Sequence, residues 1–195
     1  MHGTNRLGGN SLSDLLVFGK RTGAAAAALA KDDPETPHVS PYQVRRAEEE
    51  LLEPLRRAVG EDPYRISEEL QETMQTLVGI FRVESDLAEA EEKIAALHAR
   101  WGDVRMTGGP AFNPGWDLVF ELRNLLIVSE AITRSALQRK ESRGAHSRLD
   151  YTDTDPGWGN KNSIVRRRLD GAMEITTTAL PPMPDDLRAL LGSAH

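Results

Sequence analysis

Residues 116–137 read WDLVFELRNLLIVSEAITRSAL, and their apolar side chains recur at intervals of three and four residues. This spacing is typical of an amphipathic α-helix that turns one face to a hydrophobic core. Two stretches upstream show the same pattern. Their apolar positions are Ile66, Leu70, Met74, Leu77, Val78 and Phe81 in the first, and Leu87, Ala90, Ile94, Leu97 and Trp101 in the second. Because the connections at 84–86 and 102–113 are short, we expect an antiparallel three-helix bundle.

Two shorter helices are predicted before the bundle. The first starts at Leu12, with Ser11 as its N-cap, and runs through the alanine-rich residues 24–30. Gly19 and Gly23 leave one face of this helix bare, which favours close packing against another backbone. A linker is expected at 31–41, where proline and aspartate accumulate.

The second short helix is expected from about Tyr42 to Val59, ending at Gly60. The bundle should then begin with Asp62 as an N-cap and Pro63 at the first helical position.

After the bundle the pattern changes to loops and strands. Residues 150–162 contain aspartates, glycines and a proline, which indicate a loop. Residues 164–178 predict a β-hairpin, because Asp170-Gly171 suits a type I′ turn. A last short helix is expected at 185–191. The predicted fold class is therefore mainly α, with a helix before the bundle and a hairpin after it.

Composition excludes several classes of protein. The 195 residues are 28% charged and 39% hydrophobic, as in a globular domain. The net charge of −6 argues against nucleic-acid binding, and no apolar run reaches the ~20 residues that span a bilayer. There is no cysteine and no metal-ligand spacing of histidines. No signal peptide is recognisable, so we expect the protein in the cytoplasm or at the cytoplasmic face of a membrane.

The segment at residues 2–19, HGTNRLGGNSLSDLLVFG, is a glycine loop that enters a helix N-terminus. Free N–H groups and the helix dipole favour an anion or an electron-rich ring there. Arg6 adds a planar fork suited to a carboxylate. Taken alone, such a loop is more often simple turn chemistry.

The sequence of this segment resembles the corresponding segment of the succinate dehydrogenase/fumarate reductase flavoprotein subunits. A second segment, RKESRGAHSRLDY at 139–151, resembles the signature that follows the helical bundle in the same family. The resemblance implies that Arg6 binds a carboxylate of succinate or fumarate, and that Ser11 and Leu12 contact the isoalloxazine ring of FAD. It also implies that an iron–sulfur subunit and a membrane anchor are partners.

By the same resemblance, residues 1–41 are a remnant of the FAD-binding domain, 42–150 the helical C-terminal domain and 151–195 an irregular tail with a hairpin. The dinucleotide-binding fold and the family's catalytic arginine would lie upstream of Met1. We therefore expect this chain to hold no catalytic residue and not to retain FAD alone. A truncated gene product, a mis-assigned start and a separately produced fragment all fit.

Three functions stay open at this stage. The chain is a fragment of a succinate dehydrogenase/fumarate reductase flavoprotein, a non-catalytic helical interaction module, or a fragment of L-aspartate oxidase. Gly8-Gly9 argues mildly against the last, because the resemblance implies Ala-Ser there. For Arg143 and His146 a catalytic role competes with a buried polar cluster in which Glu141, Arg143, Arg148 and Asp150 pair; we favour the cluster.

Overall fold

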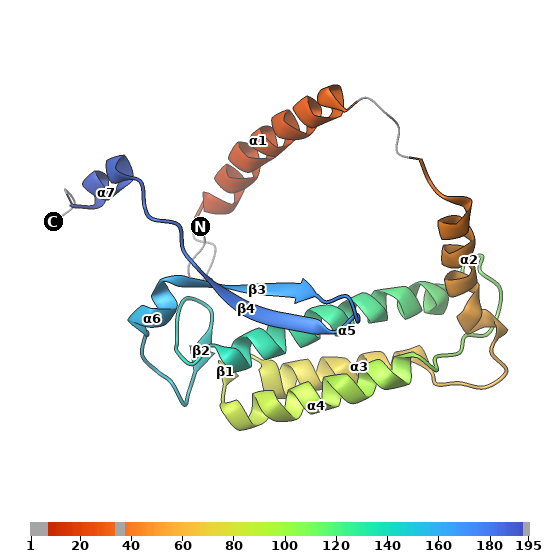
Figure 1. The fold of residues 1–195 in the computed structure, drawn as a ribbon. Coiled ribbons are helices and arrows are strands. Elements are labelled where there is room, and N and C mark those ends of the chain that lie inside the picture. Colours follow the sequence, from red (N-terminus) through yellow and green to blue (C-terminus); the bar gives the residue numbers. More distant parts are fainter. Residues whose placement is uncertain (1–7, 34–37, 193–195) are drawn as a thin grey trace.

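The computed structural model describes residues 8–33 and 38–192 of the chain, without the side chains of 190–192. As predicted, the architecture is mainly helical (Figure 1). The helices are α1 (Asn10–Asp32), α2 (Pro41–Arg56), α3 (Pro63–Thr73), α4 (Glu84–Trp101), α5 (Pro114–Gln138), α6 (Pro156–Gly159) and α7 (Asp185–Gly192). The strands are β1 (Phe81–Arg82), β2 (Ser147–Arg148), β3 (Lys161–Arg167) and β4 (Met173–Ala179).

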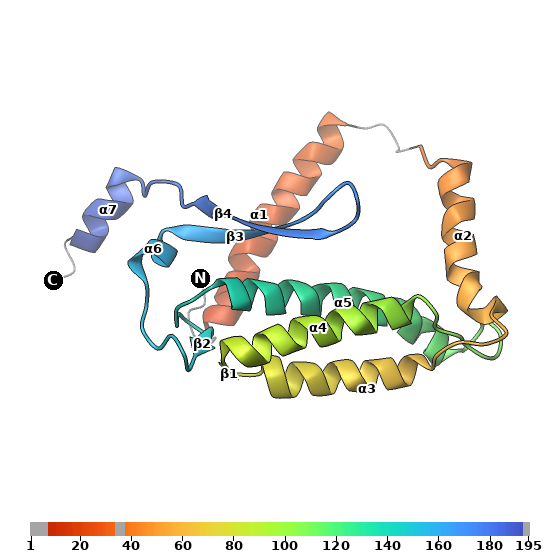
Figure 2. The ribbon, with the colours of Figure 1, turned by 60° about the horizontal axis from the view of Figure 1, so that its bottom comes forward.

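Helices α3, α4 and α5 lie side by side and share one hydrophobic core (Figure 2). This core contains apolar side chains at the expected three- and four-residue spacing: Ile66, Leu70, Ile94, Leu97, Val104, Val119, Leu122 and Leu126. A second buried cluster lies at the other end of the same helices, with Val78, Leu87, Ala90 and Ala136. Burial of a Leu or Ile side chain contributes about 1.5–3 kcal/mol, so these two clusters are the main source of stability.

The first helix of the bundle ends earlier than its apolar pattern indicates. After α3 the chain widens into the short π-helix η1 (Met74–Val78) and turns at Gly79. Phe81 lies beyond this turn in strand β1 and is 67% exposed, so its assignment to the helical face was wrong. The next helix begins at Glu84, within the stretch that the sequence had suggested as the connection.

The caps around α2 and α3 follow local chemistry. Ser40 and Gln43 form a capping box at the start of α2, which ends at Arg56 rather than near Val59. The side chain of Asp62 accepts a hydrogen bond from the backbone N–H of Tyr64 (3.0 Å). The predicted N-cap at Asp62 is therefore confirmed, with Pro63 following it.

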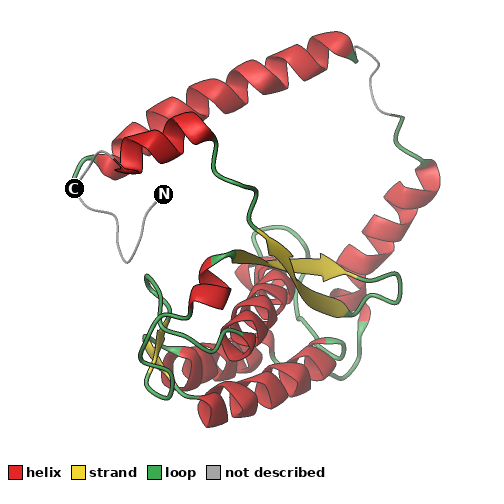
Figure 3. Cartoon of the chain, turned by 60° about the vertical axis from the view of Figure 1, so that its left-hand side comes forward, coloured by secondary structure: helices red, strands yellow, loops and turns green. Residues whose placement is uncertain are grey.

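Helix α1 lies apart from the bundle in Figures 1 and 3. None of its residues is buried. Its N-cap is Gly9 and not Ser11, and no side chain caps it, so that prediction was wrong. The hydroxyl of Ser13 donates to the carbonyl of Gly9 instead (3.3 Å). The exposed apolar side chains of α1 thus have no partner surface in the described part of the chain.

The C-terminal hairpin consists of β3 and β4 in antiparallel register, with Val165 opposite Ile175 and Arg167 opposite Met173. In its turn only Gly171 has a positive φ (+89°), whereas a type I′ turn requires positive φ at Asp170 as well. The predicted turn type was therefore wrong, although a hairpin does lie at the predicted position. The expected loop at 150–162 contains the one-turn helix α6 and the first residues of β3.

Candidate functional site

The 139–151 segment lies where α5 ends, and β2 within it pairs in parallel with β1. The two-residue pairing places Phe81 beside Ser147 and Arg82 beside Arg148. It joins the loop after η1 to the segment after α5, although more than sixty residues separate them in the sequence. Charged side chains from both segments therefore meet at one end of the bundle.

Glu141 is the most enclosed acid in this group, with no exposed surface. Its Oε1 accepts hydrogen bonds from Nε of Arg139 (2.8 Å) and Nε of Arg143 (2.9 Å). Its Oε2 accepts from Nη2 of Arg143 (3.0 Å) and from the backbone N–H of Asp155 (2.7 Å). The Arg143 bond is the largest cause that lowers the pKa of Glu141 to about 2. Glu141 is thus a fixed anion, and no general acid or base at neutral pH.

Arg148 is 1% exposed and forms a two-point ion pair with Asp150. Its Nε and Nη2 each donate to one oxygen of that carboxylate at 2.7 Å, and this pair lowers the pKa of Asp150 to about 2. The remaining nitrogen, Nη1, donates to the carbonyl of Ala136 at the C-terminal end of α5 (3.0 Å). Because helix carbonyls near a C-terminus carry partial negative charge, the guanidinium stabilises that end of α5.

Asp150 and Arg82 complete this capping of helix ends. Asp150 Oδ2 accepts from the backbone N–H of Glu84, the first residue of α4 (2.8 Å). Nε of Arg82 donates to the carbonyl of Val78 at the end of η1 (2.7 Å). One polar cluster therefore holds the ends of η1, α4 and α5 together.

His146 is held between two arginines. Its Nε2 lies 2.9 Å from the carbonyl oxygen of Arg139, so this nitrogen carries the hydrogen. Its Nδ1 then accepts from Nη1 of Arg82 (2.9 Å). Burial, followed by the charges of Arg82 and Arg148, lowers the pKa of His146 below its usual range. The imidazole is neutral and both nitrogens are engaged, so it has no free nitrogen for catalysis.

The expected pairing of Glu141 with Arg143 and of Arg148 with Asp150 is confirmed. The roles of Arg82, Arg139 and Glu84 were missed at the sequence level. Arg82 and Glu84 are remote in the sequence, and no local pattern distinguishes their charges from ordinary surface charges. The 139–151 motif is therefore a structural element that locks the bundle.

The predicted substrate-binding residue Arg6 lies outside the described residues. The two predicted flavin contacts lie in the first turn of α1: Ser11 is half-buried and Leu12 is 68% exposed. Gly8 just before them has a positive φ (+53°), and a Cβ on Gly8 or Gly9 would meet open space in the described structure. Gly19 and Gly23 also face open space, so any close partner of this face lies outside the described chain.

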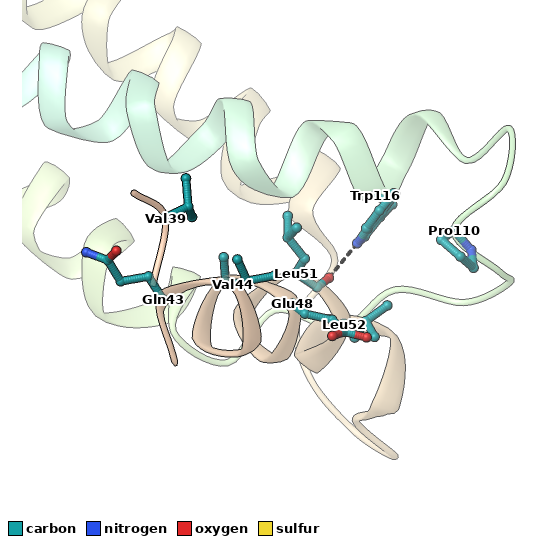
Figure 4. Close-up of a pocket in the computed structure, with 9 residues that line it drawn as sticks. Val39, Gln43, Val44, Glu48, Leu51, Leu52, Pro110 and Trp116 are labelled. Atoms are coloured by element: carbon teal, nitrogen blue, oxygen red, sulfur yellow. Dashed lines mark hydrogen bonds between the residues drawn. The ribbon is translucent and has the colours of Figure 1, made fainter. Parts of the chain in front are cut away.

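An apolar groove of about 680 Å³ lies between α2 and the start of α5 (Figure 4). Val44 and Leu51 line it from α2, and Val39 and Trp116 complete it. The indole nitrogen of Trp116 donates to the carbonyl of Leu51 (2.7 Å), which fixes the ring beside the helix. The described residues hold no cluster of acids and histidines that could bind a metal. None of the helices described is both long and apolar enough to cross a bilayer.

The described chain is therefore a helical bundle held together by buried ion pairs, with an exposed helix before it and a hairpin after it. The family model for the fumarate reductase flavoprotein C-terminus matches residues 67–184, and this chain belongs to that family.

Individual relatives agree with this assignment. The fumarate reductase flavoprotein subunit of Haemophilus influenzae is 36% identical over 180 residues, which cover 90% of this chain and 30% of that protein. The fumarate reductase flavoprotein subunit of Escherichia coli is 35% identical over 193 residues, which cover 93% of this chain and 32% of that protein. The solved structure of Mycobacterium smegmatis Sdh1 in complex with UQ1 matches with a TM-score of 0.88 and 43% identity, and covers 100% of this chain and 33% of the matched chain. The chain thus spans about a third of the length of its relatives.

Proposed function

We propose that this chain acts as the C-terminal part of a succinate dehydrogenase/fumarate reductase flavoprotein subunit, inactive alone. The observation that carries this proposal is the polar cluster built by the 139–151 motif. Every charged side chain of the 139–151 motif is paired, and the motif connects the ends of the bundle helices. Such an arrangement suits a supporting domain and not an independent catalyst. The family match over residues 67–184 supports the same assignment.

In the complete subunit, α1 would belong to the flavin-binding domain. The backbone at Ser11 and Leu12 would contact FAD, and Arg6 would hold a carboxylate of succinate or fumarate. FAD supplies the hydride acceptor and donor for interconversion of the two acids. The positive end of the α1 dipole would stabilise negative charge on the reduced ring. Support comes from the uncapped, exposed start of α1 and from its 23 residues without a buried side chain.

The partners of the complete subunit would be an iron–sulfur protein and a membrane anchor at the cytoplasmic face. The solved relative in complex with UQ1 supports a quinone-linked assembly. The apolar groove between α2 and α5, like the bare face of α1, would be covered by the rest of the subunit.

A chimeric subunit tests the proposal. The matching C-terminal third of the Escherichia coli fumarate reductase flavoprotein is replaced by this chain, and flavin content and fumarate reduction are measured. We expect a yellow, active chimera, and a colourless preparation of the isolated 195-residue chain. A folded chimera without flavin, or an isolated chain with one equivalent of FAD, would refute the proposal.

Arg6 is tested in the same chimera. Arg6→Lys keeps the charge but loses the planar fork, and should lower turnover by roughly a hundredfold. Arg45→Lys on α2 is the control and should turn over normally. Unchanged fumarate reduction by Arg6→Lys would remove Arg6 from the substrate site. Turnover of L-aspartate in place of succinate would instead indicate L-aspartate oxidase.

A non-catalytic interaction module is the second candidate. The exposed apolar side of α1 favours it, because such a surface also suits a protein partner. An inactive but stably assembled chimera would support this interpretation.

A further inference from the structure

A second cavity, of about 760 Å³, lies on the side of the bundle that the hairpin covers. Residues of α2, α4, α5, β3 and β4 line it. Nη1 of Arg134 on α5 donates to the carbonyl of Met173 (3.1 Å), so the hairpin is tied to the bundle beside the cavity. Its volume is in the range of small-molecule sites.

Positive charge is concentrated around this cavity although the chain carries a net charge of −6. Five arginines and two glutamates line it: Arg46, Arg123, Arg134, Arg166, Arg167, Glu50 and Glu130. Arg123 pairs with Glu50, and Arg134 pairs with Glu130 and with Glu91. Among the described residues Arg46 and Arg167 have no ion-pair partner, so the cavity has cationic groups available for an anion.

The hairpin register places Arg167 on the cavity side. Residues directly opposite each other in a sheet share a face, and alternate residues of a strand do so too. Arg167 is opposite Met173 and alternates with Val165, and all three line the cavity. Arg166 is opposite Glu174 and also borders the cavity. Arg46 borders the same cavity from α2.

His98 contributes part of its side chain to the cavity lining. Its Nε2 is shielded from solvent and forms no hydrogen bond, and the nearest acid, Glu130, lies 3.7 Å away at Oε2. His98 lines the same cavity and lies on α4.

The rest of the lining is apolar. Trp101, Ile127 and Val165 border the cavity, and the guanidinium of Arg123 lies 5.9 Å from the centre of the Trp101 ring. The indole nitrogen of Trp101 donates to the carbonyl of Val119 (2.8 Å), so the ring is fixed. Such a surface favours the flat, apolar part of an organic ligand.

We propose that this cavity between the hairpin and the bundle binds a small organic polyanion with a flat apolar body, of the class of nucleoside phosphates. Arg46 and Arg167 receive the anionic groups, and Trp101 lies beside the body. The site is separate from the start of α1 and does not depend on the proposed role in the flavoprotein.

Isothermal titration of the full 195-residue chain with ATP, in EDTA at low salt, tests this. Inorganic pyrophosphate is titrated in parallel. We expect ATP to bind about tenfold more tightly than pyrophosphate, because only ATP has an apolar body to bury. Affinity for both should fall as salt is raised.

The variants are Arg46→Gln, Arg167→Gln and, as the matched control, Arg45→Gln, which removes the same charge from the neighbouring position of α2 outside the cavity. Each of the first two should weaken ATP binding about tenfold, and the control less than twofold. Circular dichroism melts confirm that all three remain folded. The proposal is overturned if ATP shows no binding at millimolar concentration, if pyrophosphate binds as tightly as ATP, or if Arg45→Gln has the same effect as the cavity variants.

Discussion

At the scale of single residues, Glu141 has the strongest consequences for stability. Its carboxylate is fully enclosed and accepts hydrogen bonds from two arginines and a backbone N–H. Removing one member of such a buried group leaves the other charges without compensation. Glu141→Gln should therefore lower the free energy of unfolding by about 3 kcal/mol in urea titrations at pH 7. Glu89→Gln, in an exposed pair with Lys93, is the control and should change it much less. Equal losses in the two variants would contradict the structural role of Glu141.

The same carboxylates predict acid sensitivity. The pKa values of Glu141 and Asp150 are both lowered to about 2 in the folded chain, from ordinary values of 4.5 and 3.8. Groups with a depressed folded-state pKa stabilise the protein above their ordinary pKa. That contribution is lost as the pH falls from about 4.5 toward 2. Urea unfolding at pH 7, 4 and 2.5 should show this decline, and the decline should be shallower in Glu141→Gln. An unchanged slope in the variant would show that Glu141 does not carry it.

His146 predicts a second, separate decline nearer neutrality. Because its pKa is lowered in the folded state, the unfolded chain takes up a proton first as the pH falls below about 6.5. Stability should therefore decrease as the pH falls below about 6.5. Gln in place of His146 can donate to the Arg139 carbonyl and accept from Arg82 without titrating. His146→Gln should remain folded at pH 7 and lose this step, as measured by thermal melts. A step that persists unchanged would assign it to another group.

At the scale of elements, α1 and α5 are long helices of opposite character. All residues of α1 lie outside the core, whereas α5 buries Val119, Leu122 and Leu126. An isolated helix is marginal in water, so its protection must come from packing. Hydrogen exchange followed by mass spectrometry should show that amides from Leu12 to Leu29 exchange much faster than those from Leu118 to Leu137. Similar protection of the two stretches would mean that α1 is not a helix awaiting a partner surface.

The same contrast shows what the sequence could predict. The bundle helices and the caps at Asp62 and Pro63 follow from local periodicity and local hydrogen bonds. The position of Phe81 does not, because a π-turn and Gly79 end the helix while the apolar spacing continues. The pairing of β1 with β2 involves only two residues on each side, and a strand this short has no alternation to detect. Arg82 and Glu84 join the polar cluster through that pairing, so their roles emerge only in three dimensions.

At the scale of the whole molecule, the bundle is stabilised by contacts among its own helices. Its two buried clusters come from η1, α3, α4 and α5 and adjoining residues, and the polar cluster ties η1, α4 and α5 together at one end. The hairpin is attached from outside by the bond from Arg134 to Met173. None of these contacts involves α1. The core of the bundle is therefore formed without α1, and α1 has the surface of a segment that packs elsewhere.

Removal of residues 1–40 should consequently leave the rest of the chain folded and about as stable. No side chain of α1 is buried, so removing this segment takes no apolar group out of the core. It also removes the exposed Leu12, Leu15, Leu16, Val17 and Phe18, which favour association between molecules. We expect a melting temperature within a few degrees of the full chain, since a change of 1 kcal/mol shifts a domain of this size by about 2–4 °C. We also expect a sharper monomer peak in size-exclusion chromatography.

The matched comparison removes residues 157–195 instead. This deletion takes away the hairpin with its hydrogen bond to Arg134 and the cation–π contact between Trp158 and Arg139. That deletion should lower the melting temperature more. If loss of residues 1–40 lowers the melting temperature more than loss of residues 157–195, then α1 packs against the bundle in solution. Its exposed face would then not be a surface for the rest of a flavoprotein subunit.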